Sequence, residues 1–337
     1  MREYTRFRQE FIVQVVSEYY SVLQNKDVAR NEWKSYQSFL GNLDRERALA
    51  REGRRTQSDV GRLEQAALNS RRSWVASVQR YESSLDRFKI TLGLPTRVNV
   101  VLDDTDLVQL RELGIEHPAL TADDAVQVAL AARLDLMTEA DRVADAERRV
   151  TVAANGLKPD LDIVASAQVD SDPDGNAFDL DFDDAILDAG FAIDLPLDRK
   201  AERNAYRAAL IGQERARRAH TLSADTVVLE VRNASRALEE ARLSYEIALT
   251  SVDVNRRRLE EQELRADVGR GTTIDLVDAQ NDLTDAQNGL TAALIQHTLA
   301  RLAYWRDMGI LYIGRGGNWE PLEVPAASEP YPLSTTE

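Results

Sequence analysis

The stretches AREGRRTQSDV (residues 50–60) and ADVGRGTTIDLVDAQ (residues 266–280) decide the fold of this 337-residue chain. They align without a gap at an offset of 216 residues, and five aligned pairs are identical: Ala50/Ala266, Gly53/Gly269, Arg54/Arg270, Thr56/Thr272 and Asp59/Asp275. The same offset brings Gly93 of LGLP opposite Gly309 of MGIL. Identities between these marks are few, so the repeat is old and structural. Each copy is typical of a long helix, a tight turn and a helix that returns, which predicts a duplicated helical hairpin.

Composition excludes several classes of protein. The chain has no Cys, which rules out disulfides, thiol nucleophiles and Cys metal sites. The net charge of −15 disfavours nucleic acid as a partner, because such proteins present a basic face. No apolar stretch is long enough for a transmembrane helix. The three histidines, His117, His220 and His297, lack metal-ligand spacing, and we expect no metal and no cofactor. Phosphate loops and HExxH motifs are also missing, so we expect no catalytic residues and no enzyme.

The first part of the chain predicts helices over about residues 3–52 and 58–92. Gly93 and Pro95 end the second helix, because Pro removes a donor and Gly accepts a left-handed cap. The apolar run VNVVLDD (98–104) is compatible with a short strand. Thr121 is expected to cap a following helix, and another helix is expected over about 134–155.

Two later segments change to a period of two, which predicts strands over 161–169 and 187–197. The first places apolar residues on one face: Leu161, Ile163, Ala165, Ala167 and Val169. The second does the same: Leu187, Ala189, Phe191, Ile193, Leu195 and Leu197. Periodicity alone fits both a hairpin with one face on a core and a transmembrane barrel hairpin with one face toward lipid.

The helical pattern returns after Arg199 and continues to about residue 267, then resumes after the turn. Apolar residues recur at heptad spacing in both helices, which predicts close coiled-coil packing. The first seam comprises Val227, Val231, Ala234, Leu238, Ala241, Tyr245, Ala248 and Val252. The second comprises Leu276, Ala279, Leu283, Ala286, Leu290, Ala293, His297, Ala300 and Tyr304. We expect His297 to be a packed residue rather than a ligand.

This order of elements resembles the TolC-type outer-membrane efflux protein family. The two turn motifs carry the resemblance, together with LGLP (92–95) and ALAARLDLMTEADRVADAERRV (129–150), and it covers roughly residues 5–313. It implies a mainly α fold with long, duplicated, antiparallel coiled-coil hairpins and one β-hairpin contributing to a trimeric transmembrane β-barrel. It also favours the barrel interpretation of the two strands.

The resemblance implies five regions along the chain. They are an incomplete first helical hairpin (1–95), an equatorial linker with helices (96–156), a transmembrane β-hairpin with a surface loop (157–198), a second helical hairpin (199–311) and an extended tail (312–337). Members of the family have two strand pairs and a signal, whereas this sequence shows only the second pair. We therefore expect the chain to be truncated at its N-terminus.

The resemblance also implies a function and a location. It predicts the outer-membrane channel of a tripartite efflux or type I secretion system, located in the outer membrane with its helices in the periplasm. Expected partners are two further copies of the chain, a periplasmic adaptor protein, an inner-membrane pump and outer-membrane lipid. The alternatives are a soluble periplasmic coiled-coil adaptor or scaffold, and a fragment without function. An adaptor usually has one helical hairpin, which favours the channel.

The candidate site lies at the two turns, which are expected to form the tip of the tunnel. Asp275 and Asp278 share one helical face beside the second turn, and Asp59 matches the same position in the first. By resemblance these aspartates form the gate that constricts the channel, while Asp275 also suits a helix cap beside Thr272 and Thr273. The turn motif itself comprises Gly53, Arg54, Gly269, Arg270 and Gly271.

The family's gate is also tied shut by an Arg and a Tyr, and the sequence departs from that pattern. These positions fall at Gly271 and Ala266 here. Arg54 and Arg270 are the possible substitutes for the missing tie.

The acidic loop DSDPDGNAFDLD (170–181) has the spacing of a calcium loop, with candidate ligands Asp170, Asp172, Asp174 and Asp181. However, the last position lacks the bidentate Glu, Pro173 interrupts the loop, and strands flank it. A solvated acidic surface loop is the favoured interpretation.

Overall fold

The computed structural model describes residues 1–169, 186–194, 198–268, 270–313 and 319–321. The chain divides into two compact units. One comprises residues 1–134 and 226–337, and the other comprises residues 135–225.

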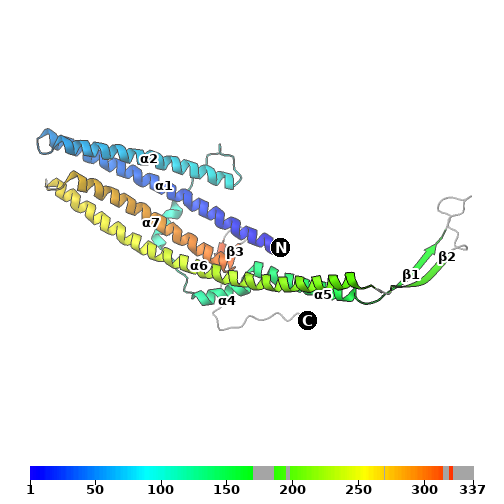
Figure 1. Ribbon diagram of the computed structural model, residues 1–337. Helices are drawn as coiled ribbons and strands as arrows, with labels where there is room; N and C mark the ends of the chain where they lie inside the picture. The colour runs from blue at the N-terminus through cyan, green and yellow to red at the C-terminus, as the bar shows by residue number, and fades with distance from the viewer. Residues whose placement is uncertain (170–185, 195–197, 269, 314–318, 322–337) are drawn as a thin grey trace, which may run out of the picture. The chain divides into compact units, whose positions relative to one another are not determined.

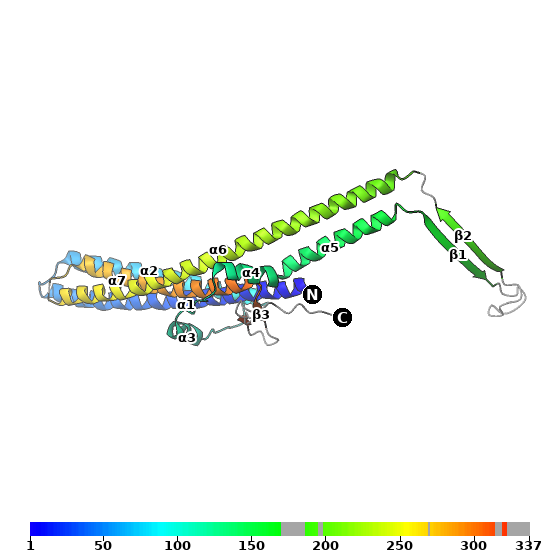
Figure 2. The same ribbon diagram turned by 90° about the horizontal axis from the view of Figure 1, so that it is seen from below.

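The first unit contains the two predicted helical hairpins. Helices α1 (Arg2–Arg51) and α2 (Gln57–Thr91) form one hairpin. The second hairpin consists of α6 (Lys200–Asp267), from residue 226 onward, and α7 (Thr273–Asp307). Helix α1 lies beside both α2 and α7, and the two turns lie at the same end (Figures 1 and 2). The duplicated antiparallel architecture is therefore confirmed.

Most residues of the predicted seams are buried in this unit, whereas Ala234, Ala248, Ala286, Leu290 and Ala293 are half-buried. On α6 the seam residues Val227, Val231, Leu238, Ala241, Tyr245 and Val252 are all buried. On α7 the same is true of Leu276, Ala279, Leu283, His297, Ala300 and Tyr304. Alanines at these positions let the helix backbones approach closely, while the larger residues fill the space between helices and are removed from water.

The repeat extends to the far ends of both hairpins. Gly93 follows α2 with φ of 71°, and Gly309 follows α7 with φ of 76°. This left-handed conformation is disfavoured for residues with a Cβ, and it ends each helix in the same way. The alignment of these two glycines in the sequence therefore corresponds to equivalent backbone geometry.

The linker after α2 differs from one expectation. Residues 98–104 form no strand, and α3 (Thr105–Leu113) follows them directly. Leu102 is buried beside Val22 and Leu23 of α1, and its carbonyl accepts a hydrogen bond from the Lys26 ammonium at 3.0 Å. Side chains of α1 therefore hold this segment, so the apolar run is used for packing rather than for a strand. The expected cap is confirmed, because the Thr121 side chain accepts from the Asp124 N–H at the start of α4 (Ala122–Ala132).

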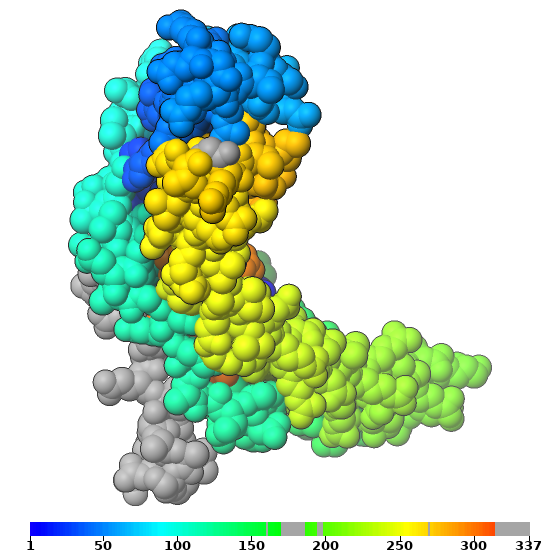
Figure 3. Space-filling view, turned by 90° about the vertical axis from the view of Figure 1, so that its left-hand side faces the viewer, coloured from blue at the N-terminus to red at the C-terminus, as the bar shows by residue number. Residues whose placement is uncertain are grey.

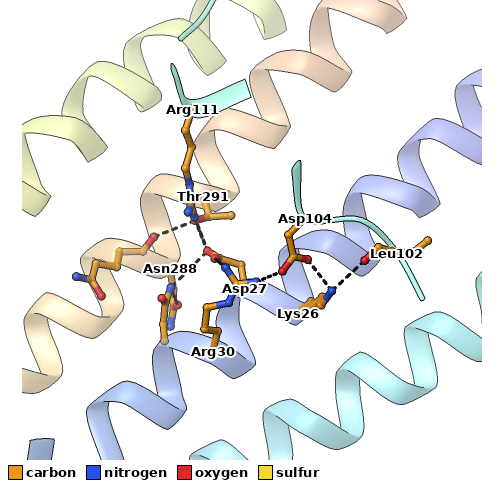
Figure 4. A network of polar contacts seen from close by, with 10 residues as sticks. Lys26, Asp27, Arg30, Leu102, Asp104, Arg111, Asn288 and Thr291 are labelled. Carbon is orange, nitrogen blue, oxygen red and sulfur yellow. Dashed lines mark hydrogen bonds and ion pairs between the residues drawn. The ribbon is translucent and has the colours of Figure 1, made fainter. Parts of the chain in front are cut away.

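A buried carboxylate fixes α3 to the helices beneath it (Figure 4). Asp27 of α1 is only 2% exposed and forms an ion pair with Arg111 of α3. The Thr291 hydroxyl of α7 donates to the same carboxylate at 2.8 Å. A buried charge is tolerated when it is paired and hydrogen-bonded in this way. These contacts join α1, α3 and α7 in one arrangement.

His297 is a packed residue, as predicted. Its side chain is 1% exposed and its ring centroid lies 6.0 Å from that of His117. Burial and the neighbouring positive charge of Arg301 lower its pKa to about 4, so the ring is neutral at pH 7.

The second unit comprises α5 (Leu134–Asn155) from residue 135, the first part of α6, and strands β1 (Asp160–Gln168) and β2 (Ile186–Asp194). The predicted helix over 134–155 is confirmed. Glu147 of α5 accepts hydrogen bonds from Arg217 at 2.9 Å and Gln213 at 3.3 Å, which join α5 to α6.

The sequence did not predict one small element of the first unit. Strands β3 (Leu311–Ile313) and β4 (Trp319–Pro321) pair antiparallel where an extended tail was expected. The Gln9 side chain of α1 donates to the Leu311 carbonyl at 2.7 Å and anchors this pair. Among the helices of the described residues, none is both long and apolar enough to cross a membrane.

Candidate functional site at the two helical turns

The first turn joins α1 to α2 through a left-handed glycine and a capping box. Gly53 has φ of 73°, and a Cβ there would meet no atom within 4 Å, so its backbone conformation alone favours glycine. The Asp59 N–H donates to Thr56 Oγ1 at 3.2 Å, and the Thr56 N–H, at 3.3 Å, and the Thr56 hydroxyl, at 2.6 Å, both donate to the Asp59 carboxylate. These contacts satisfy donors that the helix start would otherwise leave unpaired.

The second turn repeats the cap at the equivalent residues. The Asp275 N–H donates to Thr272 Oγ1 at 3.1 Å, and the Thr272 hydroxyl donates to the Asp275 carboxylate at 2.7 Å. Glycine is required at position 271 for a different reason than at Gly53. A Cβ on Gly271 would lie 2.8 Å from the Ala266 backbone nitrogen. A side chain would fit there only if the backbone shifted. Gly269 lies outside the described residues.

A polar cluster, which we call the clasp, joins the two turns: Glu46, Arg55, Gly271 and Thr273. Arg55 donates to the Gly271 carbonyl at 3.1 Å and pairs with Glu46 at 3.2 Å. The Thr273 hydroxyl donates to the same Glu46 carboxylate at 3.5 Å. Only 14% of the Arg55 side chain and 10% of the Glu46 side chain are exposed, so water screens this pair weakly. Figure 3 shows the first turn, in blue, lying directly against the second, in yellow.

An exposed ion pair reinforces the clasp from outside. Arg45 of α1 pairs with Asp267 at the end of α6, and these side chains remain 49% and 44% exposed. Exposed pairs contribute little free energy, typically about 0–1 kcal/mol. The partly buried clasp is therefore the stronger connection between the turns.

Arg54 and Arg270, the arginines expected to replace the family's tie, do not make the contact that Arg55 makes across the two turns. Arg54 pairs with Glu52 of its own turn at 3.8 Å, and the Arg270 side chain is exposed. Sequence reasoning missed Arg55, although a signal was present. Arg55 and Gly271 are equivalent positions at the 216-residue offset, and equivalent positions of two paired copies can meet each other.

The acidic residues differ in their surroundings. Asp275 and Asp278 are both exposed on α7, while Asp59 is half-buried at the start of α2. The hydrogen bond from Thr56, and then the charge of Arg55, hold the pKa of Asp59 below its ordinary value. Thr272 rather than Asp275 is the N-cap of α7, and the Asp275 side chain, which accepts from the Thr272 hydroxyl, remains open to solvent and to other charged groups.

The β-hairpin presents a second functional surface. Its register places apolar residues opposite each other along one face: Leu161/Ile193, Ile163/Phe191, Ala165/Ala189 and Ala167/Leu187. These large side chains are exposed, Leu187 at 79% and Phe191 at 76%. An exposed apolar face on this scale marks a surface made for another apolar medium or partner. The expected strand residues Leu195 and Leu197 and the candidate calcium ligands Asp170, Asp172, Asp174 and Asp181 lie outside the described residues.

Known proteins identify the class. The family model for outer membrane efflux proteins matches residues 125–303, more than half of the chain. The chain belongs to the outer membrane efflux protein family, whose members are outer-membrane channels and not enzymes.

Solved structures share the fold. The outer-membrane channel OprN matches with a TM-score of 0.74 at 16% identity, over 91% of this chain and 68% of that one. The CmeC outer membrane channel of Campylobacter jejuni gives 0.70 at 15% identity, over 91% and 64%. The outer membrane protein VceC of Vibrio cholerae gives 0.70 at 16% identity, over 89% and 70%. The chain thus spans 64–70% of the length of these structures. No curated protein sequence matches it closely enough to count as a relative.

Proposed function

We propose that this protein is a passive export duct in the outer membrane, the channel component of a tripartite efflux or type I secretion system. In this proposal three copies form one channel, and a periplasmic adaptor connects it to an inner-membrane pump that supplies the energy. The observation that carries the proposal is the duplicated pair of helical hairpins combined with a β-hairpin that exposes a continuous apolar face. A soluble adaptor has no use for that face.

The hairpin supports contact with outer-membrane lipid. All four facing pairs on one side are apolar, whereas the other side mixes the polar residues Asp162, Ser166, Gln168 and Asp188 with Val164, Ile186, Gly190 and Ala192. Alternation of this kind suits a strand pair with lipid on one side and a polar lumen on the other.

The turns support a gate at the periplasmic mouth. Asp275 and Asp278 are exposed and one helical turn apart, so three copies around one axis would bring six carboxylates together. Within each chain, Asp59 adds the equivalent carboxylate of the first sequence repeat. Rings of carboxylates favour cations, as in cation-selective pores. The clasp at Arg55 and Glu46 would then hold the two hairpins of each copy together at this mouth.

Single-channel recording in a planar bilayer tests the proposal. We expect the wild-type channel to prefer cations and to be blocked by multivalent cations, and the double variant Asp275→Asn/Asp278→Asn to lose much of both. Asp253→Asn is the matched control, because Asp253 is an exposed aspartate of α6 that pairs with Arg257 within its own helix. If conductance is present but selectivity and block are unchanged in the double variant, the gate assignment is wrong. If the protein inserts and gives no conductance, the channel proposal itself is overturned.

A further inference from the structure

The linker between α3 and α4 (residues 114–121) contacts α6 and α7 through a cluster of titratable side chains, separate from the two turns and from the β-hairpin. The ring centroid of His117 in this linker lies 6.0 Å from that of His297 on α7. Its Nε2 lies 3.6 Å from a carboxylate oxygen of Glu239 on α6. One histidine of the linker therefore contacts both helices.

Two arginines complete the cluster. Arg301 of α7, whose side chain is only 13% exposed, donates to the Glu116 carboxylate of the linker at 2.9 Å and to the Glu116 carbonyl at 3.3 Å. Arg242 of α6 pairs with Glu239 at 2.7 Å. Both carboxylates of the cluster therefore already face cations, and the pair at Arg301 holds the linker against α7.

The His297 ring has no acceptor for a second proton. Its side chain is 1% exposed, and its buried Nε2 has no hydrogen-bond partner among the described residues. A neutral imidazole donates from one nitrogen only, whereas an imidazolium donates from both. A buried charge without a partner is costly, so the charged ring does not fit this site unless the surroundings open.

The neighbouring charges also oppose a positive charge on His297. Arg301 on the same helix, His117 of the linker when it is protonated, and Arg242 of α6 all act against it. On the α1 side, Tyr20 lies near Arg301, and its phenol is neutral at pH 7 because burial raises its pKa. Each element around the ring therefore disfavours the imidazolium or leaves it without a counter-charge.

We propose that this cluster is a pH-sensitive switch that releases the linker in acid. At neutral pH the uncharged His297 ring packs against the linker. In acid a proton binds the ring where residues 114–121 have moved away from α6 and α7 and water reaches the nitrogen. Because the proton binds the released form more tightly, it shifts the population toward that form. Helix α4 stays in place through Ala125 and Ala129, which are buried in the core with α6 and α7.

The size of the shift follows from the difference in proton affinity between the two forms. Burial, and then the charge of Arg301, lower the pKa of His297 to about 4 in the closed form, whereas the ordinary value of 6.5 applies once the ring is exposed. The closed form is therefore fully favoured above pH 6.5, and its advantage is lost as the pH falls from 6.5 toward 4. Between pH 8 and pH 5 the ratio of released to closed linker should rise about 30-fold.

Spin labelling of the whole chain tests the switch. The sequence contains no Cys, so a nitroxide attached to Leu120→Cys, at a 36% exposed position of the linker, is a unique label. We expect the ratio of mobile to immobile label to rise about 30-fold from pH 8 to pH 5, reversibly. His297→Gln, which cannot be protonated, should remove most of this rise. His220→Gln is the matched control, because His220 is a half-buried histidine of α6 in the other unit.

The switch is overturned if the label mobility does not change between pH 8 and pH 5, or if His297→Gln and wild type change equally. Magnetic resonance of the unlabelled wild type covers the case in which His297→Gln fails to fold. Only three histidines contribute imidazole signals, and single changes at His117 and His220 identify the third. We expect the His297 signal to titrate clearly below pH 6.5. Titration of all three histidines at their ordinary pKa would also overturn the proposal.

Discussion

The two turns are copies of one motif, but they differ at one aligned pair of residues, Arg55 and Gly271. Thr56 and Thr272 both cap the following helices by accepting from the N–H of the aspartate three residues on. Gly53, however, is required by its positive φ, whereas Gly271 is required because the Ala266 backbone occupies the space of a Cβ. Arg55 of the first turn reaches the Gly271 carbonyl of the second repeat, whereas its aligned partner Gly271 has no side chain to return that contact. Duplication therefore preserved the local caps, while the contact between the copies is asymmetric.

The largest expected effect comes from removing the side chain that joins the copies. Arg55→Met leaves the Glu46 carboxylate, 10% exposed, without its cation. Breaking a buried pair costs about 3–5 kcal/mol, and the residual exposure places this one at the lower end. Thermal and denaturant unfolding would measure it. Arg54→Met is the matched control, because Arg54 is 62% exposed, and its effect should stay within about 0.5 kcal/mol. Equal effects of both changes would show that the clasp does not join the turns.

The next largest effect on stability distinguishes Gly53 from Gly271. Gly271→Ala should lower the free energy of unfolding by about 1–3 kcal/mol, because backbone must shift to admit the methyl group. Gly53→Ala should cost about 1–2 kcal/mol through its left-handed backbone. Gly53→Asn should recover part of that cost, since Asn tolerates this conformation, whereas Gly271→Asn should be no better than Gly271→Ala. Recovery by Asn at both positions would contradict the distinction.

A smaller effect should be the same in both copies. Thr56→Ala and Thr272→Ala each remove a cap hydroxyl that pairs with an aspartate, and each should cost about 1 kcal/mol. Serine at either position should restore most of the loss. A cost confined to one copy would mean that the two caps are not equivalent.

The smallest effect is a dependence on pH. The pKa of Asp59 is lower in the folded protein than its ordinary value of 3.8, first because Thr56 donates a hydrogen bond to it. Its stabilisation is thus complete above that ordinary value and is lost as pH falls through the lower, folded pKa. Unfolding experiments should show a drop in stability below about pH 4 that is shallower in Asp59→Asn. The same slope in both proteins would show that Asp59 does not contribute.

The sequence predicts much of this architecture because periodicity and turn chemistry are local. The seams on α6 and α7, the Thr121 cap and the alternating faces of β1 and β2 all follow from residues near in sequence. The segment 98–104 was interpreted wrongly because its apolar residues also suit a strand. In the folded protein the segment is held instead by α1, through the hydrogen bond from Lys26 and the packing of Leu102 against Val22. Arg55 was missed for the same reason: whether Arg54, Arg55 or Arg270 reaches the second copy depends on how distant helices pack.

The unpaired outer edges of the β-hairpin have a consequence for how the protein assembles. Among the described residues, β1 and β2 pair only with each other, so each strand keeps one edge with free peptide groups. A lone two-stranded hairpin is marginally stable in water, and open edges recruit further strands. The helical hairpins can form within one chain, in a first-order process. Completion of the hairpin requires strands from outside it, so we expect the final step of maturation to be concentration-dependent and to need protection from aggregation beforehand.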